Sequence, residues 1–127
     1  MKRAISAEAA PAAIGPYSQA IHAGELLFIS GQLGIDPATK AIVDGGIEPQ
    51  AKRALANIAA ICEAAGASMS AVVKTTVLLQ SMDDFAKLNA IYATFFGEIP
   101  PARATYQVGR LPLGALVEIE AIAYLGR

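Results

Sequence analysis

Residues 71–79 read AVVKTTVLL, and this stretch decides the fold. Its β-branched and aliphatic residues are typical of a buried strand. A segment with helical periodicity lies on each side of it, and further strand patterns lie beyond those segments. This order of elements predicts an α+β fold, in which one mixed β-sheet carries two helices packed on a single face.

Two apolar stripes at helical spacing predict the helices. The first covers residues 49–65, where Pro49 stands near the first turn and Gly66 supplies the stop. The second begins at Ser81, a residue type that caps helix N-termini, and Gly97 ends it. The remaining strands are expected at residues 2–6, 18–22, 26–30, 102–108 and 116–124.

The chain has 127 residues and a mass of 13.1 kDa, which is the size of one domain spanning residues 1–127. Its net charge of −1 argues against a protein that binds nucleic acid or an anionic membrane, because such proteins carry an excess of positive charge. His22 and Cys62 are the only histidine and cysteine, too few for a disulfide or a structural zinc site. We expect no metal site, signal peptide or membrane span, and hence a cytoplasmic protein.

The composition also predicts an oligomer. Hydrophobic residues make up 54% of the chain and its mean hydropathy is +0.44, whereas an average domain is roughly 45–50% apolar. A domain of this size buries only about two-thirds of the surface that its unfolded chain exposes. Part of the apolar excess must therefore lie outside, where burial between subunits commonly covers it.

Alternation along the last two predicted strands suggests a site. Arg103 and Thr105 share one face of their strand, and Glu118 and Glu120 share the face of theirs that points away from the helices. If these strands pair as an antiparallel hairpin, the arginine and the glutamates lie together on the helix-free face. The pattern by itself is typical of a solvated sheet with cross-strand ion pairs. The other interpretation is a cleft between subunits, where Arg103 holds a carboxylate and a glutamate handles water or a proton.

Four further residues are weaker candidates. Tyr17 lies in a predicted loop, where its hydroxyl could meet a ligand. Ser30 and Gly31 end a predicted strand, where a free backbone N–H could meet an anion. Asn89 interrupts the second helix and needs partners if it is buried. Each also has an ordinary structural explanation, which is packing for Tyr17, a plain strand end for Ser30 and Gly31, and a structural role for Asn89, and the pattern alone favours these explanations.

Four blocks of sequence, in order along nearly the whole chain, resemble the RidA (YjgF) family of enamine/imine deaminases. They are residues 10–20 (APAAIGPYSQA), 29–32 (ISGQ), 101–103 (PAR) with 110–112 (RLP), and 117–121 (VEIEA). The ordered combination is highly specific. The resemblance implies a chorismate-mutase-like fold and a homotrimer whose sheets face a central barrel, with three clefts between subunits.

The resemblance also implies an activity and a site. The activity is hydrolysis of reactive 2-imino acids, such as 2-iminopropanoate and 2-iminobutanoate, to 2-oxo acids and ammonia, with no cofactor. Such intermediates leak from pyridoxal-phosphate enzymes, so the implied role is control of metabolite damage. By position, Arg103 matches the residue that binds the substrate carboxylate, and Glu118 matches the residue that orients the attacking water. The positions that line or support the cleft are Tyr17, Ser30, Gly31, Asn89 and Thr105. At Thr105, well-known members carry a cysteine, whose role is attributed largely to its backbone carbonyl.

Two alternatives stay open on the sequence. A non-catalytic protein that binds small ligands could use the same cleft, because a carboxylate needs Arg103 and little else. An endoribonuclease or translation inhibitor is the other, since this activity is also reported within the family. The net charge of −1 and the lack of a basic, aromatic-lined stripe argue against RNA. The expected partners are small 2-imino and 2-oxo acids and further copies of the chain, with no membrane and no nucleic acid.

Overall fold

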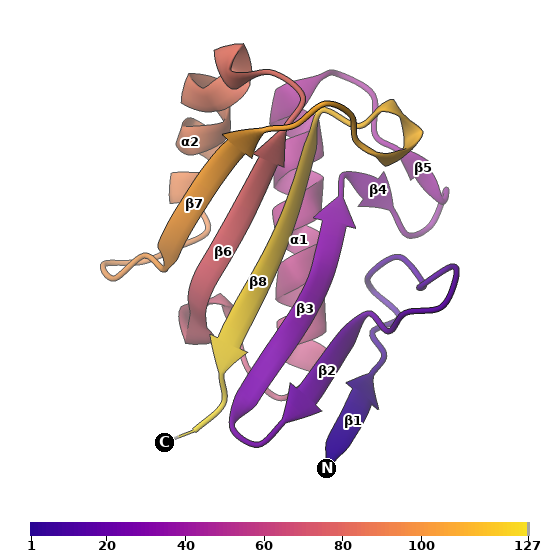
Figure 1. The fold of residues 1–127 in the computed structure, drawn as a ribbon, viewed down its shortest axis with the longest axis vertical. Helices are drawn as coiled ribbons and strands as arrows, with labels where there is room; N and C mark the ends of the chain where they lie inside the picture. Colours follow the sequence, from indigo (N-terminus) through magenta and orange to yellow (C-terminus); the bar gives the residue numbers. More distant parts are fainter. Residues whose placement is uncertain (127) are drawn as a thin grey trace.

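The computed structural model, which describes residues 1–126, forms a six-stranded mixed sheet with two helices on one face (Figure 1). The strands are β1 (Lys2–Ile5), β2 (Ala20–Ala23), β3 (Leu26–Leu33), β6 (Val72–Leu79), β7 (Ala102–Gln107) and β8 (Val117–Tyr124). Their order across the sheet is β1-β2-β3-β8-β6-β7, so β8 lies inside the sheet and β7 at an edge. The α+β class predicted from the sequence is confirmed.

Both helices form where the apolar stripes predicted them. α1 (Ile47–Ala64) begins before Pro49, and its buried stripe packs on β3 and β8. α2 (Phe85–Ala93) is shorter than the predicted segment, because its first turn is the 3-10 turn η2 (Met82–Asp84). Ser81 acts as a cap, since its hydroxyl accepts a hydrogen bond from a backbone N–H of η2 at 3.1 Å. Within the described residues, no helix is long and apolar enough to cross a membrane.

Two features between residues 30 and 42 differ from the prediction. β3 continues to Leu33, so Ser30 and Gly31 lie within the strand and the expectation that they end it is wrong. The chain then adds a small sheet of β4 (Ile35–Asp36) and β5 (Ala41–Ile42), which the sequence pattern did not predict. Strands of two residues are too short for alternation to reveal them.

The last two strands do not pair as the antiparallel hairpin considered above. β7 runs parallel to β6, and β8 pairs antiparallel with β6 on the other side. The helix α2 explains the parallel pair, because parallel neighbours need a crossover connection and a helix commonly provides it. A loop with the turn η3 (Pro112–Gly114) then leads from β7 to β8.

The core lies between the sheet and the helices, as the alternation along β8 predicted. Val117, Ile119 and Ala123 of β8 are fully buried on this side, together with Leu55 and Ile58 of α1. No helix covers the opposite face of the sheet, which faces the viewer in Figure 1. We call it the helix-free face.

Large apolar side chains remain exposed on the helix-free face. Phe28 of β3 is 44% exposed and Tyr106 of β7 is 56% exposed. Ile122 of β8 is half-buried and pairs in register with Phe28. The chain by itself therefore leaves part of its apolar surface in contact with solvent, as its composition predicted.

Candidate active site

Glu118 lies on the helix-free face of β8, next to an irregularity in β3. The pairing of these strands shifts between Ile29 and Gln32, which marks a β-bulge around Ser30 and Gly31. The bulge brings the Gly31 backbone against the Glu118 side chain: a Cβ built on Gly31 would lie 2.5 Å from Glu118 Oε2. Because glycine has no Cβ, the space next to position 31 stays open for the Glu118 carboxylate.

The surroundings of Glu118 raise the pKa of its carboxyl. Burial is the main cause, and the negative charge of Glu120 on the same face adds to it. A carboxylate with a raised pKa holds a proton more readily near neutral pH than an ordinary glutamate does. Glu118 is therefore suited to accept a proton from water and release it again.

Hydrogen bonds tie Ser30 to the loop that carries Tyr17. The Ser30 hydroxyl donates to the Ser18 carbonyl at 2.6 Å, and its N–H donates to the Gln19 carbonyl at 3.0 Å. The buried Gln19 side chain bonds in turn to backbone groups of residues 7–11. Tyr17 is 53% exposed at the end of this anchored loop. We call Tyr17, Ser30, Gly31 and Glu118 the carboxylate half.

Arg103 lies on the edge strand β7 and turns toward α2. Its Nη1 donates to Asn89 Oδ1 at 2.8 Å. Its guanidinium carbon lies 4.7 Å from the centre of the Tyr92 ring and 5.4 Å from that of Phe85, within the range of cation–π contacts. Arg103 is also exposed to solvent, so its remaining donors can bind an anion. We call Asn89, Arg103 and Thr105 the arginine half.

Arg103 and Glu118 lie on opposite faces of the sheet, contrary to the prediction. Arg103 pairs in register with Thr75, which is buried on the helix side. Glu118 pairs with Leu78, which lies on the helix-free face. The prediction assumed the register of a β7–β8 hairpin, whereas the parallel pairing of β7 with β6 sets a different register. Within one chain, the sheet therefore separates these two candidate residues.

Thr105 follows Arg103 on the helix side of β7. It pairs in register with the fully buried Val77. Its Oγ1 is buried and has no hydrogen-bond partner among residues 1–126. A buried hydroxyl without a partner destabilises the fold, because its hydrogen bonds to water are lost and not replaced.

Sequence reasoning missed three residues that hold these halves in place: Gln19, Phe85 and Tyr92. The two aromatic residues fall on the apolar stripe of the second helix, where core packing is the ordinary explanation. Their spacing was nevertheless a signal, because Phe85, Asn89 and Tyr92 share one face of a helix. Gln19 gave no such signal, since a polar residue beside a loop fits many roles.

The sequence and the fold match those of known proteins. The model of a family described as endoribonuclease L-PSP matches residues 7–125. The chain belongs to the RidA (endoribonuclease L-PSP) family. Among relatives, a RutC family protein of Pyrococcus horikoshii is 57% identical over 124 residues, which cover 98% of each chain. The 2-iminobutanoate/2-iminopropanoate deaminase of Mus musculus is 52% identical over 126 residues, 99% of this chain and 93% of that protein.

A solved structure extends the agreement to three dimensions. TdcF of E. coli with bound serine superposes with a TM-score of 0.93 at 40% identity, and the match covers 98% of this chain and 99% of that one. The resemblance seen in the four sequence blocks is confirmed.

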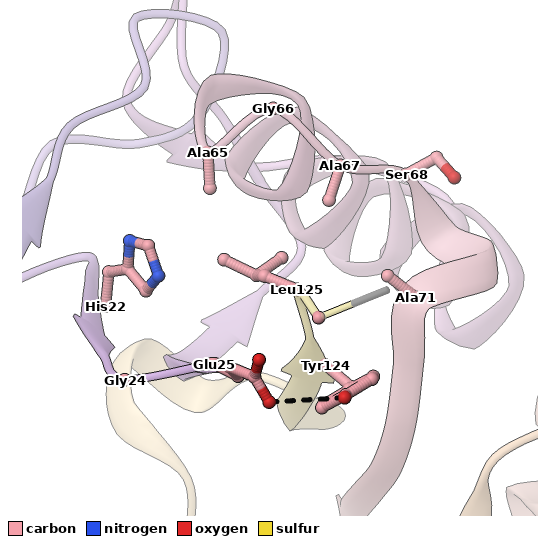
Figure 2. A pocket seen from close by; sticks show the side chains of 11 residues that line it. His22, Gly24, Glu25, Ala65, Gly66, Ala67, Ser68, Ala71, Tyr124 and Leu125 are labelled. Carbon is pink, nitrogen blue, oxygen red and sulfur yellow. Dashed lines mark hydrogen bonds between the residues drawn. The ribbon is translucent and has the colours of Figure 1, made fainter.

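A cavity of about 770 Å³ lies outside both halves (Figure 2). It is bordered by the β2–β3 turn, the loop after α1 and the end of β8. Glu25 and Tyr124 line it and are joined by a hydrogen bond of 3.2 Å. None of the predicted site residues lines this cavity. In this member of the RidA family, the candidate site is therefore not this cavity.

Proposed function

We propose that the chain catalyses the hydrolytic deamination of reactive 2-imino acids, including 2-iminobutanoate and 2-iminopropanoate, to 2-oxo acids and ammonia. The fixed guanidinium of Arg103 carries this proposal, because it offers paired donors for the substrate carboxylate. Two relatives support it. The Mus musculus protein is named for this activity, and TdcF was solved with serine, a small molecule that also carries a carboxylate.

The proposed chemistry needs one proton acceptor and a well-oriented water. The water oxygen bonds to the electrophilic carbon of the protonated imine while Glu118 accepts a proton from that water. Glu118 then gives this proton to the amino nitrogen of the adduct. The C–N bond breaks and ammonia leaves, while the hydroxyl passes its proton back to the Glu118 carboxylate and becomes the carbonyl of the 2-oxo acid. The raised pKa of Glu118 supports this role.

The opposite placement of the two halves favours a cleft shared between chains. We expect a homotrimer in which helix-free faces pack together and the edge strand β7, which carries Arg103, brings the arginine half of one chain to the carboxylate half of the next. The exposed apolar side chains of Phe28 and Tyr106 support packing through this face. In each of the three clefts, Arg103 would hold the carboxylate and Glu118 of the next chain would act on the water.

The direct test follows the appearance of 2-oxo acid from freshly generated 2-iminopropanoate, corrected for spontaneous hydrolysis. Arg103→Ala should nearly abolish activity. Arg103→Lys should lower kcat/KM by roughly tenfold or more, because lysine lacks the paired donors. Glu118→Gln should depress kcat with a smaller effect on the affinity for the 2-oxo acid. Parental turnover by Arg103→Ala would refute the assignment of Arg103.

Mixing two inactive variants tests whether the cleft is shared. Arg103→Ala and Glu118→Gln chains are unfolded together and refolded in equal amounts. Every mixed trimer then contains one cleft with both Arg103 and Glu118, so about one quarter of the parental activity should return. If no activity returns, the shared cleft is refuted, while the reaction assigned to the chain still stands on the direct assay.

The family description favours a second candidate, the cleavage of RNA. The net charge of −1 weighs against it, because RNA binding relies on cationic side chains along the backbone. Ribosomal RNA cleavage should be measured beside imine hydrolysis on one preparation. Cleavage of RNA without imine hydrolysis would replace the first proposal. Binding of a 2-oxo acid without turnover of the imine would instead identify a non-catalytic ligand-binding protein.

A further inference from the structure

Arg103 rests on contacts that reach into the core. The Tyr92 ring lies 4.7 Å from the guanidinium carbon. The Tyr92 hydroxyl shares a hydrogen bond of 2.7 Å with the hydroxyl of Thr75, and both residues are buried, at 6% and 1% exposure. The ring also packs against Phe96, with 4.7 Å between the ring centres. Tyr92 is thus held both at its hydroxyl and along its ring.

The neighbouring strands β6 and β7 carry two residues that contact Tyr92, namely Thr75 and Arg103. Thr75, which holds the Tyr92 hydroxyl, is the register partner of Arg103 itself. Asn89 precedes Tyr92 by one helical turn and binds the guanidinium at 2.8 Å. An exposed arginine normally samples many rotamers and loses that freedom when it binds a ligand. Here the contacts remove much of that freedom before any ligand arrives.

We propose that Tyr92, assisted by Phe85, is a positioning residue that holds Arg103 in the orientation that binds a carboxylate. This inference rests on the proposed function and deepens it. Tyr92 is buried beneath Arg103, so it acts on substrate through the arginine. The benefit is preorganisation, because an arginine already in place loses less freedom when the carboxylate binds. The contact also favours arginine over lysine, since a planar guanidinium stacks on an aromatic ring.

Single variants test this on the affinity for 2-oxobutanoate, measured by calorimetry. Tyr92→Leu should raise Kd and KM by roughly three- to tenfold and change kcat by less than about twofold. Tyr92→Phe keeps the aromatic ring, so its affinity for 2-oxobutanoate should stay much closer to that of the parent than the affinity of Tyr92→Leu. Phe96→Leu is the matched control, because it removes an aromatic neighbour of Tyr92 but leaves the contacts of Arg103. This control should lower thermal stability while Kd stays within about twofold of the parent.

A double-mutant cycle separates positioning from a general structural effect. In an Arg103→Lys background, adding Tyr92→Leu should change Kd by less than about twofold, because the stacked guanidinium is already gone. An equal effect of Tyr92→Leu in both backgrounds would overturn the inference. Unchanged affinity in Tyr92→Leu alone would overturn it as well. Failure of the proposed function would look different, since Arg103→Lys by itself would then leave Kd and kcat/KM at parental values.

Discussion

Gly31 leaves free the space that the carboxylate of Glu118 occupies. A Cβ at position 31 would lie 2.5 Å from Glu118 Oε2 and 3.1 Å from its Cγ. The need for glycine is steric and not conformational, because Gly31 has no positive φ. The β-bulge in β3 creates this contact, so one irregularity in the sheet sets the position of the carboxylate.

Gly31→Ala should therefore displace the Glu118 side chain. The new methyl group meets a flexible carboxylate and not the backbone, so the fold should persist while kcat for imine hydrolysis falls about tenfold or more. Gly97→Ala is the control, because its Cβ would meet nothing within 4 Å and its φ is not positive. A parental kcat in Gly31→Ala would show that the position of Glu118 does not limit the reaction.

The pH dependence of kcat/KM should report the pKa of Glu118. Below that pKa the carboxyl is protonated and cannot accept a proton, so activity should fall as the pH decreases. Because the pKa is raised, this loss should begin above the ordinary value of 4.5. Glu120→Gln removes a neighbouring negative charge and should move the loss to lower pH. Glu63→Gln, on the outer side of α1, is the control and should leave the pH profile unchanged. A parental pH profile in Glu120→Gln would show that the profile does not report the pKa of Glu118.

The helix-free face should hold the chains together. We expect a mass of about 39 kDa by light scattering, three times the 13.1 kDa of one chain. Phe28→Glu places a charge on this face and should yield monomers that retain their circular dichroism but lose imine hydrolysis. Lys52→Glu on α1 should remain trimeric and active. A parental chain that is monomeric at micromolar concentration would refute the trimer and the shared cleft together.

Replacing Thr105 or Thr75, on neighbouring strands, by valine should change the free energy of unfolding in opposite directions. Thr105→Val removes a buried hydroxyl that has no partner among the described residues, and should increase the free energy of unfolding by about 1 kcal/mol. Thr75→Val removes the partner of the Tyr92 hydroxyl and should decrease it by about 1–3 kcal/mol. Denaturant unfolding measures both. A loss of stability in Thr105→Val would show that its hydroxyl does find a partner.

Thr105→Cys introduces the residue that well-known family members carry at this position. It should leave imine hydrolysis within a few-fold of the parent, because the backbone at this position is expected to matter more than the side chain. A gain of about tenfold, or about 1.4 kcal/mol of barrier, would show that the side chain contributes to the reaction.

Cys62 should be unreactive in the folded chain. Its side chain is fully buried in α1, and burial together with the charge of Glu63 raises the pKa of the thiol to about 11. The reactive thiolate is therefore scarce at pH 8. A thiol reagent such as Ellman's should label the protein only after denaturation, and rapid labelling of the folded protein would contradict this.

The sequence contained enough information for both helices and the strands of the main sheet, but not for the small β4–β5 sheet or for the face of the main sheet on which Arg103 lies. Apolar stripes and strand alternation predicted both helices and the buried side of β8, because these patterns depend on neighbours along the chain. The face of Arg103 depends on which strand lies beside β7, and that is a long-range property. The β-bulge at Gly31 and the contact of Tyr92 with Arg103 are also contacts between distant segments. Periodicity within one segment does not report them.

The placement of Arg103 and Glu118 on opposite faces has a thermodynamic consequence. If one substrate must touch both, ligand binding and chain association are linked equilibria, and each strengthens the other. Dilution should then weaken catalysis per chain, and a bound 2-oxo acid should protect the assembly against dissociation. The cellular concentration of the protein would thereby become a determinant of its own specific activity.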